Sequence, residues 1–246
     1  MEYILSHTVA ENIPILWIDV IALIWFWCCW LGYTHFTRMS RGKLVNLHDV
    51  MHHVRQHWMK EMLSRDIRNM DAILMGNLLR SISFFASTSI FLLLGLVTIL
   101  GYKNQAMEIL SHIPFANETS AEIWEAKILL LAVIFINAFF KYTWSLRQYN
   151  YACILVGAAP PASTKKELLE AYTNHAGELI ANAGRHFNMG LRAYYFGLAA
   201  IAWFVHPILF MGVSALVVLV LYRREFKSRT ADTLRDLYNT CFIEKN

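Results

Sequence analysis

The chain has 246 residues, of which 57% are hydrophobic and only 16% are Asp, Glu, Lys or Arg. This composition, with several uncharged stretches of about 20 residues, is typical of an integral membrane protein and excludes an ordinary water-soluble domain. The formal net charge of +4 gives no reason to expect nucleic acid as a partner, because membrane orientation accounts for the basic segments.

Three apolar stretches are long enough to cross the hydrocarbon core of a bilayer, at about 15–34, 82–101 and 128–146. They lack the alternating pattern of barrel strands, and lipid offers no partner for backbone polar groups, so we expect helices. The fold class is therefore all-α: a polytopic helical protein with one integral membrane domain over residues 1–246, in contact with the lipid bilayer. We expect the first span to stay in place as an anchor.

Two further segments, about 43–78 and 164–190, are predicted to be helical and to lie on the cytoplasmic side. Apolar residues recur at spacings of three and four from Leu44 to Met62 and from Leu168 to Phe187, which indicates amphipathic helices. Such helices either lie on the anionic inner leaflet or pack on each other, and we favour packing because both apolar stripes need a partner. A protein partner would bind through these helices.

The first of these segments contains four histidines. His48 and His52 share one helix face, as do His53 and His57, and imidazole pairs at this spacing can bind transition metals. The two pairs point about 140° apart, however, and the spacing supplies no third ligand. Solvated or headgroup-facing histidines are the alternative, and we expect no metal and no cofactor.

The second and third spans contain polar side chains. Ser83 and Ser87 share a face of the second span, with Arg80 one turn earlier, and Asn137 lies in the middle of the third span. Small polar faces in lipid favour close packing of helices, and they also suit the wall of a water-lined pore. Both interpretations of Arg80, Ser83, Ser87 and Asn137 stay open.

The last apolar run, from Ala193 to Tyr222, is uncharged and is interrupted by His206-Pro207. It is too long for one ordinary crossing of about 20 residues and short for two. Because proline disrupts a helix, we predict a terminal hairpin with arms at 193–205 and 208–222. A re-entrant hairpin and one kinked helix are the alternatives.

Positive charge is distributed unevenly between the spans. Residues 1–14 contain no Lys or Arg and residues 102–127 contain two, whereas residues 35–80 contain eight, residues 147–192 five and the tail after Tyr222 six. Lys and Arg gather on the cytoplasmic side, so we predict an outer N-terminus and a cytoplasmic C-terminus in a bacterial inner membrane. Only a reversal at His206-Pro207 brings the basic tail to the same side as the other basic segments.

Ionisable residues inside apolar spans are costly and are usually paired, buried or functional. On this topology Asp19, Lys127 and His206 share the outer level of the membrane, and we predict a polar cluster there. Snorkelling of the lysine and a water-facing carboxylate are the alternative.

Two arginines, Arg80 and Arg192, each lie at the cytoplasmic beginning of a span. Their guanidinium groups can hold a lipid phosphate, attract an anion, or pair with Asp66 and Asp71. The sequence does not decide between these roles.

Several motifs together suggest a family. The strings at 57–65, 71–78 and 81–88, with 149–151, 157–160, 192–196, 203–207 and 222–226, resemble the bacterial and plant membrane-protein family catalogued as domain of unknown function 599. The resemblance covers nearly the whole chain, and the run of small residues and two phenylalanines at 81–88 is its most specific part. It implies a helical membrane fold and no particular activity.

No nucleophile, base and oxyanion donor can be assembled from these spacings, so we expect no enzyme. Polar residues within spans and a broken terminal hairpin favour a channel or transporter for a small ion or solute. Five short spans are few for a monomeric carrier, so this hypothesis requires a homo-oligomer. The alternative is a non-catalytic scaffold or accessory subunit of a membrane complex.

Overall fold

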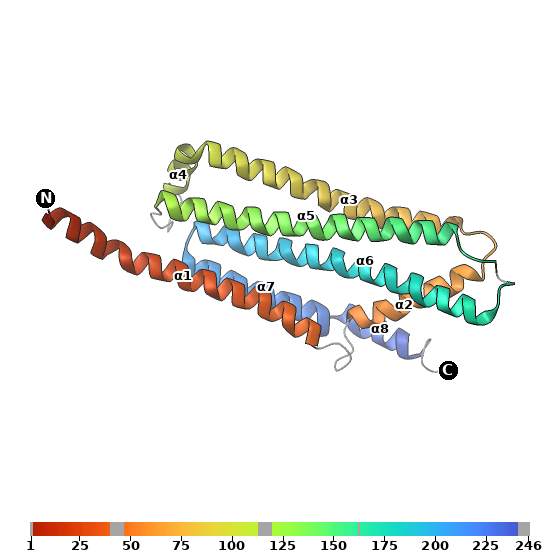
Figure 1. Cartoon of the computed structure of the whole chain (residues 1–246). Coiled ribbons are helices and arrows are strands. Elements are labelled where there is room, and N and C mark those ends of the chain that lie inside the picture. Colours follow the sequence, from red (N-terminus) through yellow and green to blue (C-terminus); the bar gives the residue numbers. More distant parts are fainter. Residues whose placement is uncertain (1, 40–46, 113–119, 162, 241–246) are drawn as a thin grey trace. The chain divides into compact units, whose positions relative to one another are not determined.

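The computed structural model describes residues 2–39, 47–112, 120–161 and 163–240, and this part of the chain is helical with no strand (Figure 1). Four segments are long and apolar enough to cross a membrane, at Trp17–Met39, Asn69–Gly101, Ala121–Gly157 and Pro207–Tyr238, which confirms the predicted fold class. The elements in chain order are α1 (Glu2–Met39), α2 (Leu47–Leu63), α3 (Asn69–Gly101), α4 (Lys103–Ser111), α5 (Ala121–Gly157), α6 (Lys166–Ile201), the 3₁₀ turn η1 (Ala202–Phe204), α7 (Pro207–Phe226) and α8 (Arg229–Tyr238).

Helices continue well beyond the apolar stretches that predicted them. The 37 residues of α5 extend for about 55 Å, which exceeds the thickness of about 30 Å of a hydrocarbon core. Likewise, the predicted segment 164–190 and the first arm of the hairpin are one helix, α6. The segment predicted at 43–78 is divided, because α2 ends at Leu63 and Asn69 already begins α3; its residues 43–46 lie outside the described ranges.

The chain reverses direction between α6 and α7, as predicted. Phe196 of α6 and Phe210 of α7 both contact the ring of Phe26, with centroid distances of 5.7 and 5.1 Å. One straight helix would separate the two residues by about 21 Å, so these contacts require a hairpin and exclude a single kinked helix. Pro207 occupies the first position of α7, where a missing N–H costs no hydrogen bond.

The arms of this hairpin are longer than the sequence suggested. The α7 helix has 20 residues, about 30 Å, because it continues past the apolar run through Arg223 and Arg224 to Phe226. Hydropathy marks where a helix becomes polar, whereas the backbone hydrogen bonds end only at Phe226. The length of α7 therefore matches one full crossing.

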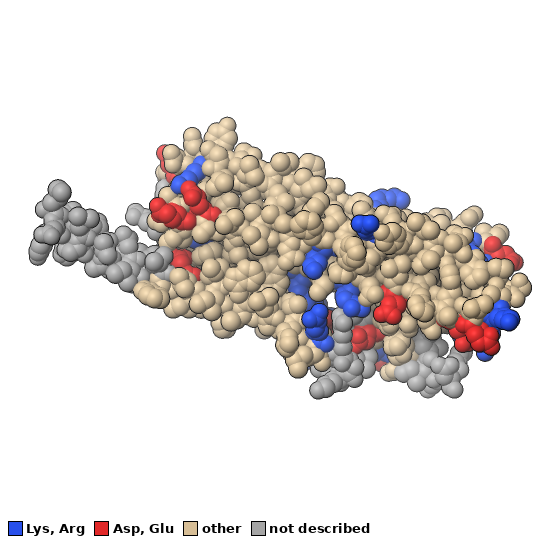
Figure 2. All heavy atoms as spheres, viewed as in Figure 1, with Lys and Arg blue, Asp and Glu red and all other residues tan. Residues whose placement is uncertain are grey.

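The chain divides into two compact units. Unit 1 consists of Met1–Met39, Gly95–Ile134 and Tyr195–Leu221, and unit 2 of Ser40–Leu94, Phe135–Tyr194 and Tyr222–Asn246. Unit 1 contains three Lys and Arg against seven Asp and Glu, whereas unit 2 contains 19 against 11. In unit 1, Figure 2 shows basic and acidic side chains together over α4 and the beginning of α5.

The core of unit 1 is built from aromatic rings. Phe26 of α1 also packs edge-on against Trp30, whose ring is stacked on Phe196 at 5.4 Å. Trp25 of the same helix donates its indole N–H to the backbone oxygen of Met211 in α7, at 3.1 Å. These contacts fasten α1 to both arms of the hairpin, and each aromatic pair adds about 0.5–1.5 kcal/mol to the burial of its surface.

The core of unit 2 is centred on Tyr142 of α5, which is fully buried. Its ring packs against Phe85 of α3 and against Phe187 and Tyr194 of α6. Gly190 of α6 makes this approach possible, because a Cβ atom there would lie 2.5 Å from Cε1 of Tyr142. Because the ring is fully buried, an atom added at Gly190 would press on packed side chains.

We therefore expect Gly190→Ala to destabilise the protein by about 1–3 kcal/mol, although alanine is the better helix former. Gly76→Ala in α3 is the matched control, because no atom lies within 4 Å of a Cβ at that position. The control should be neutral or stabilising by up to about 1 kcal/mol. Thermal unfolding of the purified protein in detergent measures both, and equal midpoints would contradict the packing described here.

Candidate functional site

Asp19 of α1 is a carboxylate buried within an apolar helix, with only 6% of its surface exposed. Its Oδ1 atom accepts a hydrogen bond of 2.6 Å from Nε1 of Trp203, which belongs to η1 and is also buried. A buried charge is costly unless it is hydrogen-bonded and paired with an opposite charge, and the indole supplies the hydrogen bond. The bond ties α1 to the turn at which the chain reverses.

Lys127 of α5 supplies the opposite charge and is 3% exposed. Its Nζ atom lies 5.5 Å from the ring centroid of Trp203 and 6.0 Å from that of Phe204, both within the range of cation–π attraction. It also interacts electrostatically with Asp19. We call Asp19, Lys127 and Trp203 the Asp19 cluster, and all three residues belong to unit 1.

The third residue predicted for this site, His206, has a different partner. Its Nδ1 atom accepts a hydrogen bond of 3.1 Å from the backbone N–H of Ile208, so the side chain caps the beginning of α7. Trp203 contributes the polar group that we expected from His206. The residue type of Trp203 could have suggested this role, because the N–H group of a buried indole usually donates a hydrogen bond to a nearby acceptor.

The serines of α3 do not all share the face that packs inside the chain. Ile82, Ala86 and Ser89 are buried, whereas Ser83 is half-buried and Ser87 is exposed. The hydroxyl of Ser89 is 2.9 Å from that of Tyr194, an interaction that the sequence did not single out.

Asn137 in the middle of α5 is exposed as well. Ser87 and Asn137 therefore contribute polar groups to the outer surface of unit 2, and their predicted role as a pore or packing face stays a prediction.

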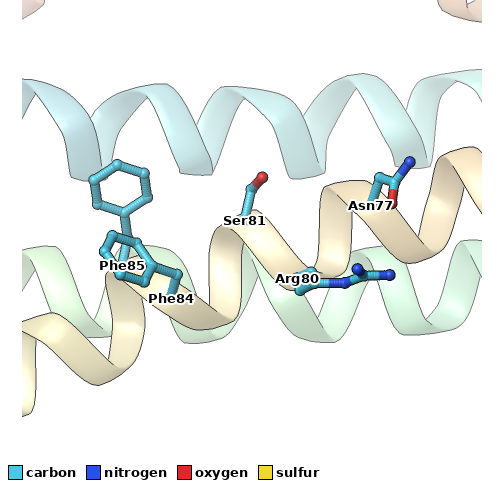
Figure 3. Close-up of a pocket in the computed structure, with 5 residues that line it drawn as sticks. All are labelled: Asn77, Arg80, Ser81, Phe84 and Phe85. Carbon is cyan, nitrogen blue, oxygen red and sulfur yellow. The ribbon is translucent and has the colours of Figure 1, made fainter.

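The two arginines have different surroundings. Arg192 is mostly buried and forms an ion pair with Glu225 of α7, at 3.5 Å. Asp71, one of the carboxylates considered for these arginines, instead binds Arg65 at 2.9 Å and the indole of Trp58 at 2.7 Å. Arg80 is exposed and belongs to an open groove on α3 (Figure 3).

The histidines of α2 point in several directions. His53 stacks on Tyr238 of α8, and His57 lies 3.6 Å from Glu61. The ring of His52 meets that of His53 edge-on, and the side chain of His48 lies outside the described part of the chain. Among the described residues, no three His, Cys, Asp or Glu side chains gather as metal ligands.

The predicted packing of the two amphipathic segments is present within unit 2. The backbones of α2 and α6 approach closely, since a Cβ atom on Gly177 would lie 2.8 Å from Cα of Gln56. Next to Gln56, the side chain of Arg55 interacts with the phenol group of Tyr149 in α5. Gly177 thus lets α2 and α6 approach each other, and Arg55 connects α2 to α5. Neither residue belongs to the apolar stripes from which the packing was predicted.

A family model described as "Protein of unknown function, DUF599" matches residues 21–230. The chain belongs to the DUF599 family. The resemblance noted in its motifs is thereby confirmed. No curated protein and no solved structure matches it.

The DUF599 match includes two members of the Asp19 cluster, Lys127 and Trp203, together with all of α2 to α7. Asp19 itself lies just before the matched residues. The family description names no activity, so the role of the cluster has to be argued from its chemistry.

In this DUF599 protein, replacing Asp19 by Leu removes both the hydrogen-bond acceptor of Trp203 and the carboxylate near Lys127. We expect a loss of about 3–5 kcal/mol, as for other buried charges deprived of their counter-charge. Asp19→Asn keeps an acceptor for the indole and should cost less. Adding Lys127→Met to Asp19→Leu should recover part of the stability in thermal unfolding, and additive losses would show that the two charges do not interact.

The packing of α2 should depend on pH. Burial, helped by nearby His53 and Arg185, lowers the pKa of His52, while Glu178 and Asp49 oppose this shift. The folded protein therefore binds a proton at His52 less readily than the unfolded chain does, and stability falls as the pH drops below about 6.5, where the unfolded chain takes up the proton. His52→Gln should reduce the loss of thermal stability between pH 7.5 and pH 5.5. His112→Gln, which replaces an exposed histidine directly after α4, should leave the loss unchanged.

Proposed function

We propose that this DUF599 protein is a homo-oligomeric membrane channel or transporter for a small ion or solute. The observation that carries the proposal is the buried pair of opposite charges, Asp19 and Lys127, within apolar helices of unit 1. Ionisable groups at membrane depth are rare, and they commonly mark ion pathways and proton relays.

The Asp19 cluster is well placed to respond to a cation or a proton. Asp19 holds the indole of Trp203, and Trp203 lies in the turn between the two arms of the hairpin. Neutralising the carboxylate weakens its attraction to Lys127 and its hydrogen bond to Trp203 at the same time. The contact between α1 and the turn would then weaken, so that the helices of the hairpin could move relative to α1. Transport proteins use such movements of helices around a binding site.

A path requires more than one packed chain. Asp19 and Lys127 are almost fully buried, and Lys127 lies over the rings of Trp203 and Phe204. At the surface of unit 2, by contrast, Ser87 and Asn137 expose polar groups within apolar helices. Such groups are costly in lipid, and a second copy of the chain or a water-filled path between copies would satisfy them.

Flux from vesicles containing the purified protein tests this proposal. We expect the wild type to release K⁺, Na⁺, Cl⁻ or H⁺ faster than empty vesicles. Asp19→Asn keeps the shape and the acceptor for Trp203, and it should slow the flux at least about tenfold, the effect of about 1.4 kcal/mol. Glu122→Gln, which removes an exposed carboxylate at the beginning of α5, is the matched control.

The outcome also separates transport from the alternative role as a scaffold or accessory subunit. If wild-type vesicles leak no faster than empty ones with every ion tested, the transport proposal fails. If Asp19→Asn transports as well as the wild type, the cluster is a structural clamp and does not take part in transport.

Cross-linking tests the oligomer separately. In a background without cysteine, Asn137→Cys should form disulfide-linked dimers in the membrane, because we place this exposed face of α5 between copies. Ile154→Cys, which is also exposed but on another face of α5, is the control. Equal cross-linking of both variants, or of neither, would count against an interface through Asn137.

A further inference from the structure

The surface of α3 in unit 2 carries an open groove of about 460 Å³, lined by Asn77, Arg80, Ser81, Phe84 and Phe85. Figure 3 shows Asn77, Ser81 and Phe85 on one side of the helix, with the guanidinium group of Arg80 extended along the helix. One end of the groove therefore offers hydrogen-bond donors and a positive charge, and the other end offers two phenyl rings.

Arg80 is available to a ligand. It is exposed, and it forms no hydrogen bond or ion pair with any residue that the structure describes. Three other arginines of the same unit are already paired with carboxylates: Arg65 with Asp71, Arg192 with Glu225 and Arg235 with Asp232. A guanidinium group with free donors at an open site matches a phosphate in charge and in geometry.

The position of Arg80 in its helix indicates what kind of phosphate compound fits. The apolar run of α3 begins directly after Ser81, and its outer face continues with Phe84, Phe91 and Leu94, which are 66%, 71% and 58% exposed. These three residues extend over about 15 Å of helix, a length suited to part of an acyl chain. A ligand with a phosphate at one end and a hydrocarbon chain at the other would contact the whole surface.

Charge supports a lipid of the anionic leaflet. Unit 2, which contains the groove, has 19 Lys and Arg against 11 Asp and Glu. Basic segments beside a membrane attract anionic headgroups. A free phosphate ion would use Arg80 but would gain nothing from the apolar half of the surface.

We propose that the groove on α3 binds one anionic phospholipid, whose phosphate contacts Arg80, Asn77 and Ser81 and whose acyl chain lies along Phe84, Phe91 and Leu94. This inference does not depend on the transport proposal, since a scaffold would also need to settle at a defined depth in the bilayer. The site would fix α3 at the boundary between headgroups and hydrocarbon.

The full-length protein in nanodiscs of equal parts phosphatidylglycerol and phosphatidylcholine, released and weighed by native mass spectrometry, tests the proposal. We expect the wild type to retain phosphatidylglycerol about tenfold more often than phosphatidylcholine. Both lipids carry a phosphate that Arg80 can bind, but phosphatidylcholine also carries a quaternary ammonium group, which cancels the net charge and is repelled by the guanidinium group. Arg80→Gln should abolish the preference, and Arg80→Lys should keep part of it. Arg147→Gln, whose native side chain lies over Tyr151 on α5, is the matched control and should retain the preference.

Two results would overturn the proposal: equal retention of both lipids by the wild type, or a full preference in Arg80→Gln. Inorganic phosphate provides a third arm. If millimolar phosphate displaces the retained lipid from the wild type, the site is one for a free anion and the lipid assignment is wrong. Because Arg80 is exposed, its replacement should leave the unfolding temperature unchanged, which separates loss of the site from loss of the fold.

Discussion

A carboxylate surrounded by apolar helices must find its hydrogen-bond donor within the protein, and Asp19 finds it in Trp203. This requirement ties α1 to the short turn that separates α6 from α7. Lys127 adds the compensating charge from α5. One polar contact thus involves three separate parts of the sequence, and the aromatic core around Phe26 packs the same helices together.

Charged residues are also divided unevenly between the two units. Unit 1 has more acidic than basic residues, and unit 2 has a clear excess of Lys and Arg. In unit 2 the basic residues are used in different ways: Arg192 joins α6 to α7 through Glu225, and Arg65 is held by Asp71. Arg65 and Arg80 are both exposed, but only Arg65 has a carboxylate partner among the described residues. Ion pairs within the chain fix helices to one another, whereas we propose that Arg80 fixes α3 to the membrane.

The sequence was sufficient to predict the fold class and the reversal, because both follow from strong signals. A run of 30 uncharged residues interrupted by His206-Pro207 allows few arrangements, and the structure has the hairpin. Helix ends were less predictable, since α5 and α6 continue into polar sequence where hydropathy gives no signal. Within the site, the proximity of Asp19 and Lys127 could be predicted from the positions of these residues in their spans. Trp203 and the cap formed by His206 depend on side-chain directions in a 3₁₀ turn, which spacing along an ideal helix does not reveal.

The claim that most of this account depends on is that the chain reverses between α6 and α7, so that it crosses the membrane an odd number of times and its two ends lie on opposite sides. Reporters fused ahead of Met1 and after Asn246, each active on only one side of the membrane, measure this directly. The account predicts that the two ends report from opposite sides, with the C-terminal reporter active in the cytoplasm. Both reporters active on the same side would contradict it, because the chain would then cross an even number of times.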